Sequence, residues 1–202
     1  PMVWLTGGGL VIGLLMVAAL VAFVFWQGLV TFWPGPVVRL QTADGSVVMG
    51  EVTRTEHYAP DPTQVAGFGV DAAAAAAREM AAGDGRVRRR LVRTGNFELS
   101  GEHFRWVEDF RLAAGGEDRP EWAHVFERTA WGRFYGVPEA FVDGDSVLAT
   151  EPAVIDGLLR SPPPGAAAPA VRVRTANGTT ADLPLATIVR SYPANRLNMA
   201  AR

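Results

Sequence analysis

Arginine is the residue type whose spacing in this sequence most clearly suggests chemistry. Five arginines lie within eight positions, and the chain contains no lysine. They are Arg86, Arg88, Arg89, Arg90 and Arg93. Because the planar guanidinium fork matches the oxygen atoms of a phosphate group, Arg88, Arg89 and Arg90 are candidate binding residues for an anionic lipid or a phosphate-like ligand. The alternative is an exposed edge strand whose charges prevent it from pairing with other chains.

The residue types that form phosphate loops, metal sites and catalytic sites in other proteins do not have the required spacing in this sequence. A Walker-type phosphate loop requires a lysine, which is missing here. The three histidines, at positions 57, 103 and 124, have no helical ligand spacing, and no cysteine could complete a zinc site. No Gly-x-Ser-x-Gly elbow occurs, and no carboxylate spacing marks an acid and a base. We therefore expect no enzyme activity, no catalytic residue, no metal site and no cofactor.

Aromatic residues in the middle of the chain could form either a hydrophobic core or a platform for a ligand. They are Phe104, Trp106, Trp131, Phe134 and Tyr135. Large aromatic side chains contribute most when their surface is buried, so the core is the favoured interpretation. The net charge of −2 gives no bulk attraction to nucleic acid, so we expect no such partner.

The first structural element that the sequence predicts is a long apolar segment at its start. No charged residue occurs before Arg39, and residues 10–26 are almost wholly apolar. A helix needs about 20 such residues to cross a bilayer core. A secretory signal has a shorter apolar stretch behind basic residues, and a buried soluble helix would rarely remain uncharged for so long. The segment therefore predicts a single membrane-spanning helix.

Individual residues of this helix suggest how it sits in a bilayer. Trp4 and Trp26 are separated by about 33 Å along a helix, and together with Trp33 they are predicted to lie at the membrane interfaces. Gly9 and Gly13 form a Gly-x-x-x-Gly pair that would let a second helix pack closely, although a flexible, glycine-rich helix start is an equal alternative. Charge bias does not orient the helix.

The rest of the chain predicts a β-rich, α+β soluble domain made of antiparallel hairpins and one or two short helices. Asp-Gly and Asn-Gly turns predict hairpins at 37–54 and 169–179. The two hairpins echo each other in sequence, and convergence on hairpin chemistry is favoured over duplication. Helices are predicted at 71–82 and 151–159, strands at 87–94 and 102–107, a tight turn within 141–148, and a loop at 55–70.

Three parts follow from these patterns. Residues 1–35 are predicted to form the transmembrane helix, because Pro34, Gly35 and Pro36 end it. Residues 36–187 are predicted to form the β-rich domain. Residues 188–202 are predicted to lead back towards a second membrane helix.

Several phrases of the sequence carry a family resemblance. They are Phe32-Trp33-Pro34 followed by Gly50-Glu51-Val52, Thr94-Gly95-Asn96 followed by Phe104-Arg105-Trp106, Trp131-Gly132-Arg133-Phe134-Tyr135-Gly136, and the segment from Ile188 to Asn195. In combination they resemble the N-terminal region of PstA-type bacterial phosphate ABC-transporter permeases. Members of that type have an enlarged domain of unknown function between their first and second membrane helices.

The resemblance implies a permease component of an ATP-driven phosphate import system in the bacterial inner membrane, with the soluble domain in the periplasm. It implies three partners, namely a second permease subunit, a cytoplasmic ATPase and a periplasmic phosphate-binding protein. The later membrane helices of that family are missing, so this chain corresponds to the first helix and a docking or regulatory domain. The alternative from a different class is a membrane-tethered extracytoplasmic binding or scaffold module unrelated to transport.

Overall fold

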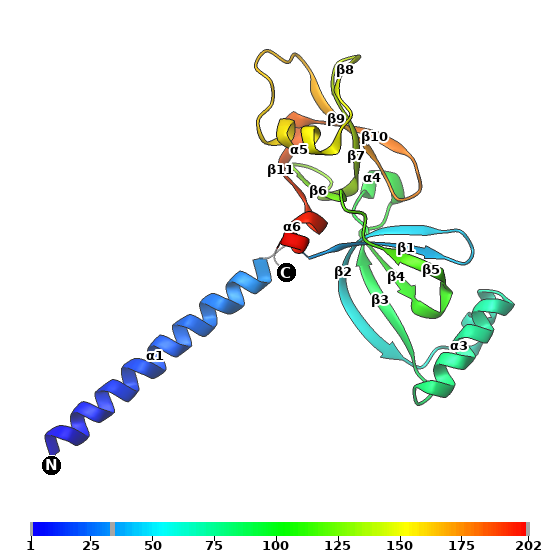
Figure 1. Ribbon diagram of the computed structural model, residues 1–202. Helices are drawn as coiled ribbons and strands as arrows, with labels where there is room; N and C mark the ends of the chain where they lie inside the picture. The colour runs from blue at the N-terminus through cyan, green and yellow to red at the C-terminus, as the bar shows by residue number, and fades with distance from the viewer. Residues whose placement is uncertain (1, 33–34, 201–202) are drawn as a thin grey trace. The chain divides into compact units, whose positions relative to one another are not determined.

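The computed structural model of the protein describes the backbone of residues 2–32 and 35–200 and the side chains of residues 7–29 and 35–197 (Figure 1). The chain forms two compact units, Pro1–Pro34 and Gly35–Arg202. The first unit contains one helix, and the second contains the strands and the shorter helices.

Helix α1, Met2–Phe32, is apolar on every side. Its stretch Gly7–Leu29 has 23 residues, a mean hydropathy of 2.7 and no buried residue. A helix of that length rises about 35 Å, which exceeds the hydrocarbon thickness of a bilayer of about 30 Å. By length and composition this helix can therefore span a membrane, as the sequence predicts.

The first sheet of the second unit is antiparallel and has the strand order β4-β3-β2-β1-β5. A 3₁₀ helix, η1, stands directly before its last strand. The strands are β1 Val37–Thr42, β2 Val47–Tyr58, β3 Val87–Arg93, β4 Phe104–Glu108 and β5 Leu112–Asp118. The helices are α2 Pro62–Gly67 and α3 Val70–Ala82 between β2 and β3, α4 Phe97–Ser100 between β3 and β4, and η1 Asp109–Arg111.

The second sheet is also antiparallel, with the order β10-β9-β7-β6-β11 and with β8 paired to the far part of β7. Helix α5 packs against β7 and β11 (Figure 1). The strands are β6 His124–Arg128, β7 Arg133–Asp143, β8 Ser146–Ala149, β9 Pro169–Arg174, β10 Thr180–Pro184 and β11 Ile188–Pro193. The helices are α5 Pro152–Arg160, η2 Leu185–Thr187 and α6 Ala194–Ala200.

The two sheets repeat one topology. In each, the last strand pairs with the first, the next three follow in order, and a 3₁₀ helix precedes the last strand. The fourth residue of the second strand is a glycine in both, Gly50 and Gly136. A Cβ atom at either would collide with the end of the third strand, at the carbonyl oxygen of Arg93 or of Arg174. The hairpins that echo each other in sequence do not correspond in this repeat, because β1–β2 comes first in its sheet whereas β9–β10 comes third and fourth.

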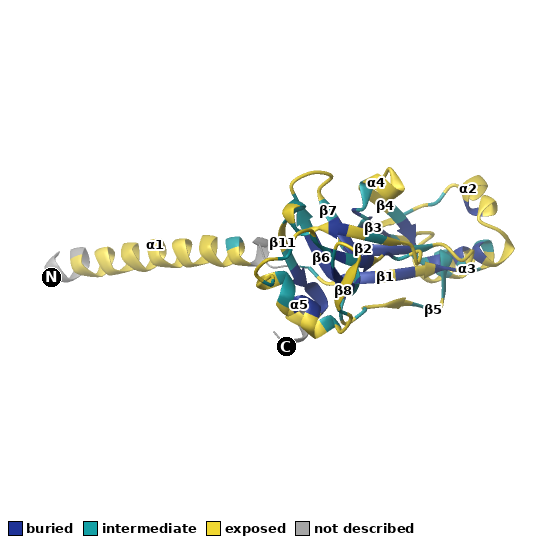
Figure 2. Cartoon of the chain, turned by 90° about the horizontal axis from the view of Figure 1, so that it is seen from above, coloured by how far each residue is buried: buried dark blue, intermediate teal, exposed yellow. Residues whose placement is uncertain are grey.

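Buried residues lie along the strands of both sheets (Figure 2). The buried side chains are hydrophobic in both sheets but differ in size. The first sheet buries Val38, Leu40, Val48, Val92 and Val107. The second buries Phe126, Phe134, Phe141, Ile155, Val171, Val173 and Leu183. A third cluster, which includes Val37, Val125, Tyr135 and Tyr192, joins strands of both sheets. This cluster therefore packs the two sheets against each other.

Three expectations from the sequence require correction. The predicted loop at 55–70 contains the end of β2, which a long hairpin extends to Tyr58, and the short helix α2, which Asp61 caps. The boundary at residue 187 falls inside the folded unit, because Ile188–Pro193 is strand β11 and pairs with β6. Strand β3 is not at an edge, because it lies between β2 and β4.

Candidate functional site

Four residues of the predicted arginine cluster lie on β3, between β2 and β4, and three of them, Arg88, Arg89 and Arg90, pair with carboxylates of the domain. Arg90 is only 7% exposed, and its guanidinium donates to Asp109 at 2.7 Å and to Glu117 at 2.8 Å. Arg88 also pairs with Asp109. Arg89 donates to Glu56 at 2.7 Å. At Arg90, which is buried, an anion would have to displace a carboxylate of the domain itself, whereas Arg88 and Arg89 already donate to carboxylates.

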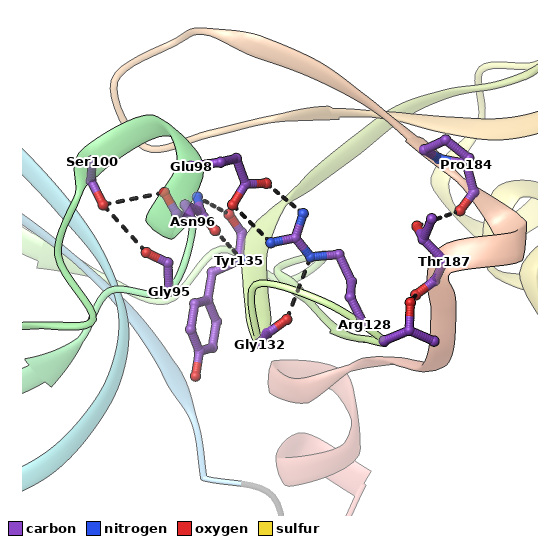
Figure 3. A network of polar contacts seen from close by, with 10 residues as sticks. Gly95, Asn96, Glu98, Ser100, Arg128, Gly132, Tyr135, Pro184 and Thr187 are labelled. Atoms are coloured by element: carbon purple, nitrogen blue, oxygen red, sulfur yellow. Dashed lines mark hydrogen bonds and ion pairs between the residues drawn. The ribbon is translucent and has the colours of Figure 1, made fainter.

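A loop of the first sheet is fastened to β7 of the second by one asparagine (Figure 3). The Asn96 side chain accepts from the backbone N–H of Tyr135 at 2.7 Å and donates to the carbonyl oxygen of Tyr135 at 3.0 Å. This amide therefore reproduces the pair of bonds that a neighbouring strand would make. Gly95 precedes it with a positive φ of 53°, and an added Cβ would lie 2.4 Å from the carbonyl oxygen of Arg133. The glycine is therefore required for this close approach.

Ion pairs strengthen the same junction. Arg128 of β6 forms a bidentate pair with Glu98 of α4, and one of its two contacts is 2.8 Å long (Figure 3). Arg133 of β7 donates to both oxygens of Glu51 of β2, at 3.0 and 2.7 Å, and to Glu127 at 3.1 Å. The Arg128–Glu98 and Arg133–Glu51 pairs join the two sheets at fixed geometry, because guanidinium and carboxylate groups match in shape.

Tyr135 lies at the centre of this junction and is fully buried. Burial is the main cause that raises the pKa of its phenol well above the usual range, and the charge of Glu51 adds to this effect. The phenol therefore remains protonated at neutral pH.

A hollow of about 250 Å³ opens beside the junction. We call it the junction hollow, and its lining residues are Arg93, Gly95, His103, Phe104 and Arg133. Among the residues whose side chains the structure describes, the Arg93 guanidinium has no hydrogen-bonded acceptor. Its nearest carboxylate is Glu51, at 3.9 Å, and its central carbon lies 5.4 Å from the centre of the Phe104 ring.

Three rings form a stack that begins at His103, which lines the hollow, and we call them the ring ledge. His103 stacks on Phe97 with 4.5 Å between ring centres, and Phe97 stacks on Trp131 at 6.0 Å. Trp131 is 59% exposed and has a positive φ of 65°. The interpretation of the aromatic residues as core is therefore right for Phe134 and Tyr135, which are fully buried, and wrong for Trp131 and for Phe104, which is 46% exposed.

A second asparagine fastens the start of the domain to its end. The Asn195 side chain accepts from the N–H of Val37 at 2.9 Å, and it donates to the carbonyl oxygens of Val37 at 2.8 Å and of Pro120 at 2.7 Å. Asn195 is 4% exposed, and its two bonds to Val37 are buried and thus shielded from water. We call this set of bonds the Asn195 clamp. The only sequence signal for it is the position of Asn195 within a phrase of the family resemblance.

The candidate residues of α1 are distributed as follows. A Cβ atom added at Gly9 or Gly13 would meet nothing within 4 Å, so this face is open to a second helix, and its packing role stays a prediction. Trp26 is exposed. The Trp4 side chain and the whole of Trp33 lie outside the described residues. Within the described part of the chain, no group of three histidine, aspartate or glutamate side chains could hold a metal ion.

Comparison with known proteins gives no relative. No protein family, no curated protein and no solved structure matches this chain. Its function is therefore inferred from its residues and their geometry.

Proposed function

We propose that this chain is the first membrane helix and the extracytoplasmic domain of a permease subunit in an ATP-driven phosphate import system of the PstA type. In this proposal α1 crosses the bacterial inner membrane and the two-sheet domain lies in the periplasm. The domain docks or regulates the other components, namely a second permease subunit, a cytoplasmic ATPase and a periplasmic phosphate-binding protein.

The Asn195 clamp is the observation that supports the proposal most directly. A domain inserted between two successive membrane helices has to receive the chain and return it at nearly the same point. Val37 is the first residue of β1 and follows closely after α1, whereas Asn195 is the second residue of α6. Because one buried amide bonds to both the N–H and the carbonyl of Val37, the chain enters and leaves the domain side by side.

The experiment that tests this proposal is phosphate uptake by cells that carry the full gene. In one variant, residues 37–194 are replaced by a short Gly/Ser linker, which can join the two ends because Val37 and Asn195 are hydrogen-bonded neighbours in the intact domain. We expect uptake, or its repression by external phosphate, to change by at least severalfold. In the control variant, the exposed loop 162–168 is replaced by a Gly/Ser segment of equal length, and we expect wild-type uptake. Unchanged uptake and unchanged repression in the first variant would contradict a role in this transport.

A membrane-tethered binding or scaffold module is the second candidate, and the junction hollow favours it. An open, cation-lined hollow beside a stack of rings that ends in the exposed Trp131 suits the binding surface of such a module. Purification of the native membrane complex distinguishes the two. Association with a second permease subunit and an ATPase supports the transport proposal, whereas association with neither supports the tethered module.

A further inference from the structure

We propose that the junction hollow and the ring ledge form a docking site for a protein segment that presents a carboxylate next to an apolar side chain. The carboxylate would bind Arg93 and His103, and the apolar side chain would lie on Phe97 and Trp131. This inference uses only the soluble domain, so it is independent of the transport proposal.

The charged residues around the hollow are the first reason to expect that it binds a carboxylate. No carboxylate lines it, whereas two guanidinium groups and an imidazole do. Arg133 donates to Glu51 and is therefore already paired. The same Glu51 carboxylate approaches Arg93 only to 3.9 Å. A guanidinium offers five N–H donors, so Arg93 retains donors for an external acceptor. Phe104 holds this guanidinium in place through a cation–π contact, so an incoming anion meets a prepositioned group.

The backbone conformation of Trp131 is the second reason to expect a docking site. A bulky residue with a positive φ is a strained outlier, and such strain is characteristic of functional positions. Asparagine or glycine would fit this turn with less strain, and burial does not justify a tryptophan there, because Trp131 is 59% exposed. The strained turn instead presents a large ring to solvent beside Phe97. Tryptophan and arginine are the residues that most often dominate the energy of protein interfaces.

The size of the hollow identifies the kind of occupant. Its volume of about 250 Å³ is below the range of roughly 300–1,000 Å³ for sites that enclose a cofactor or a drug-sized ligand. One acidic side chain fits such a hollow, and the rest of a bound segment would extend over the exposed ledge. Complementary charge would guide such a partner and fix its orientation.

The test uses the full chain of 202 residues in lipid nanodiscs and the capped peptide acetyl-Gly-Glu-Phe-Asp-Leu-Gly-amide. Binding is followed by NMR of indole N–H and histidine ring signals, with Trp131 assigned from the Trp131→Asn variant. We expect the signals of Trp131 and His103 to shift, with affinity decreasing as salt is added. The peptide with Gln and Asn in place of Glu and Asp should bind at least about tenfold more weakly, because a charged hydrogen bond is lost.

Variants of the chain complete the test. Arg93→Gln should weaken binding about tenfold or more. The matched control is Arg174→Gln, which alters the equivalent residue at the end of β9 in the second sheet, outside the hollow, and should leave binding unchanged. Trp131→Asn should weaken binding without lowering the melting temperature, because the strained backbone is relieved.

Several results would overturn the inference. These are no shift with millimolar peptide, equal binding of the uncharged peptide, and equal weakening by Arg93→Gln and Arg174→Gln. Equal affinity for N-acetylphenylalanine would show a small-molecule site and contradict a protein segment. A lower melting temperature with unchanged binding in Trp131→Asn would make Trp131 a structural residue.

Discussion

The two sheets have the same strand order, yet they are stabilised by different side chains. The second sheet fills its interior with phenylalanine rings and with Ile155 from α5. The first sheet is filled mainly by valine, and it also buries Arg90 between Asp109 and Glu117. Both nevertheless retain a glycine at the fourth position of the second strand and a 3₁₀ helix before the last strand. The two sheets therefore share these backbone features although their interiors differ in chemistry.

The largest expected effect on stability comes from a substitution in the aromatic interior of the second sheet. Phe141 is fully buried, so Phe141→Ala should lower the free energy of unfolding by about 3–5 kcal/mol. Urea denaturation of the full chain in detergent measures this loss. Val147→Ala is the control, since Val147 is 54% exposed and should change stability by less than about 0.5 kcal/mol. A loss below about 1 kcal/mol for Phe141→Ala would show that this ring does not hold the sheet together.

The next effect concerns the charged interior of the first sheet. Arg90→Ala should lower the free energy of unfolding by about 3 kcal/mol, because it leaves the carboxylates of Asp109 and Glu117 without their buried partner. Arg90→Met keeps most of the packing volume and should lose less than Arg90→Ala. Chemical denaturation again gives the values. Equal stability of all three proteins would mean that this network contributes no net stability.

Substitutions of the equivalent glycines Gly50 and Gly136 compare the stability of the two sheets directly. Gly50→Ala should destabilise more than Gly136→Ala, within a range of roughly 1–3 kcal/mol for overpacking. At Gly50 the new Cβ would lie 1.9 Å from a backbone oxygen, whereas at Gly136 its nearest atom is a Val173 methyl group at 2.2 Å. Gly157→Ala in α5 is the control, because its Cβ would meet nothing within 4 Å and should stabilise the helix by about 0.5–1 kcal/mol. Thermal melts of the three variants rank these effects.

The smallest effect compares two turns in which Asp44 and Asn177 occupy the same position, and Asp44 also pairs with Arg111. Asp44 accepts hydrogen bonds from Thr42 and Ser46, and Asn177 accepts the same bonds from Thr175 and Thr179. The Thr42 hydroxyl, followed by the Ser46 N–H, holds the pKa of Asp44 well below its usual range. The carboxylate therefore contributes stability above its unfolded pKa of about 3.9, and this contribution is lost as the pH falls through the folded pKa.

The measurement is amide hydrogen exchange of Ser46 and Thr179 between pH 6 and pH 2. After correction for the intrinsic rates, protection should fall with pH at Ser46 and not at Thr179. Asp44→Asn should remove this pH dependence at Ser46. Parallel behaviour of both turns would disprove a role of the Asp44 charge.

Sequence patterns predict the local elements of this fold well. The Asp-Gly and Asn-Gly turns mark the β1–β2 and β9–β10 hairpins, and the helices expected at 71–82 and 151–159 agree with α3 and α5 to within one residue at each end. These signals succeed because turn chemistry and helix caps act over a few neighbouring residues. The alternation of interior and exterior residues in β1 also follows the sequence.

The repeat and the candidate site could not be predicted in the same way. The repeat is visible only when the strand order is known, although Val92-Arg93-Thr94 and Val173-Arg174-Thr175 end equivalent strands and give a faint signal. The junction hollow unites a loop after β3 with the start of β7, and Asn96 fixes their distance through two bonds to Tyr135. Because these contacting residues are far apart along the chain, no local sequence pattern predicts their contact.

The Asn195 clamp also has a consequence for biosynthesis. Val37 emerges from the ribosome 158 residues before the side chain that bonds to it. At about 5–20 residues per second, this interval lasts roughly 8–30 s. The first sheet is complete once Asp118 has been made, and the second is complete once Pro193 has been made, so each sheet can form in turn. The clamp is the last of these contacts to become possible, and it forms only after the entire domain has been synthesised.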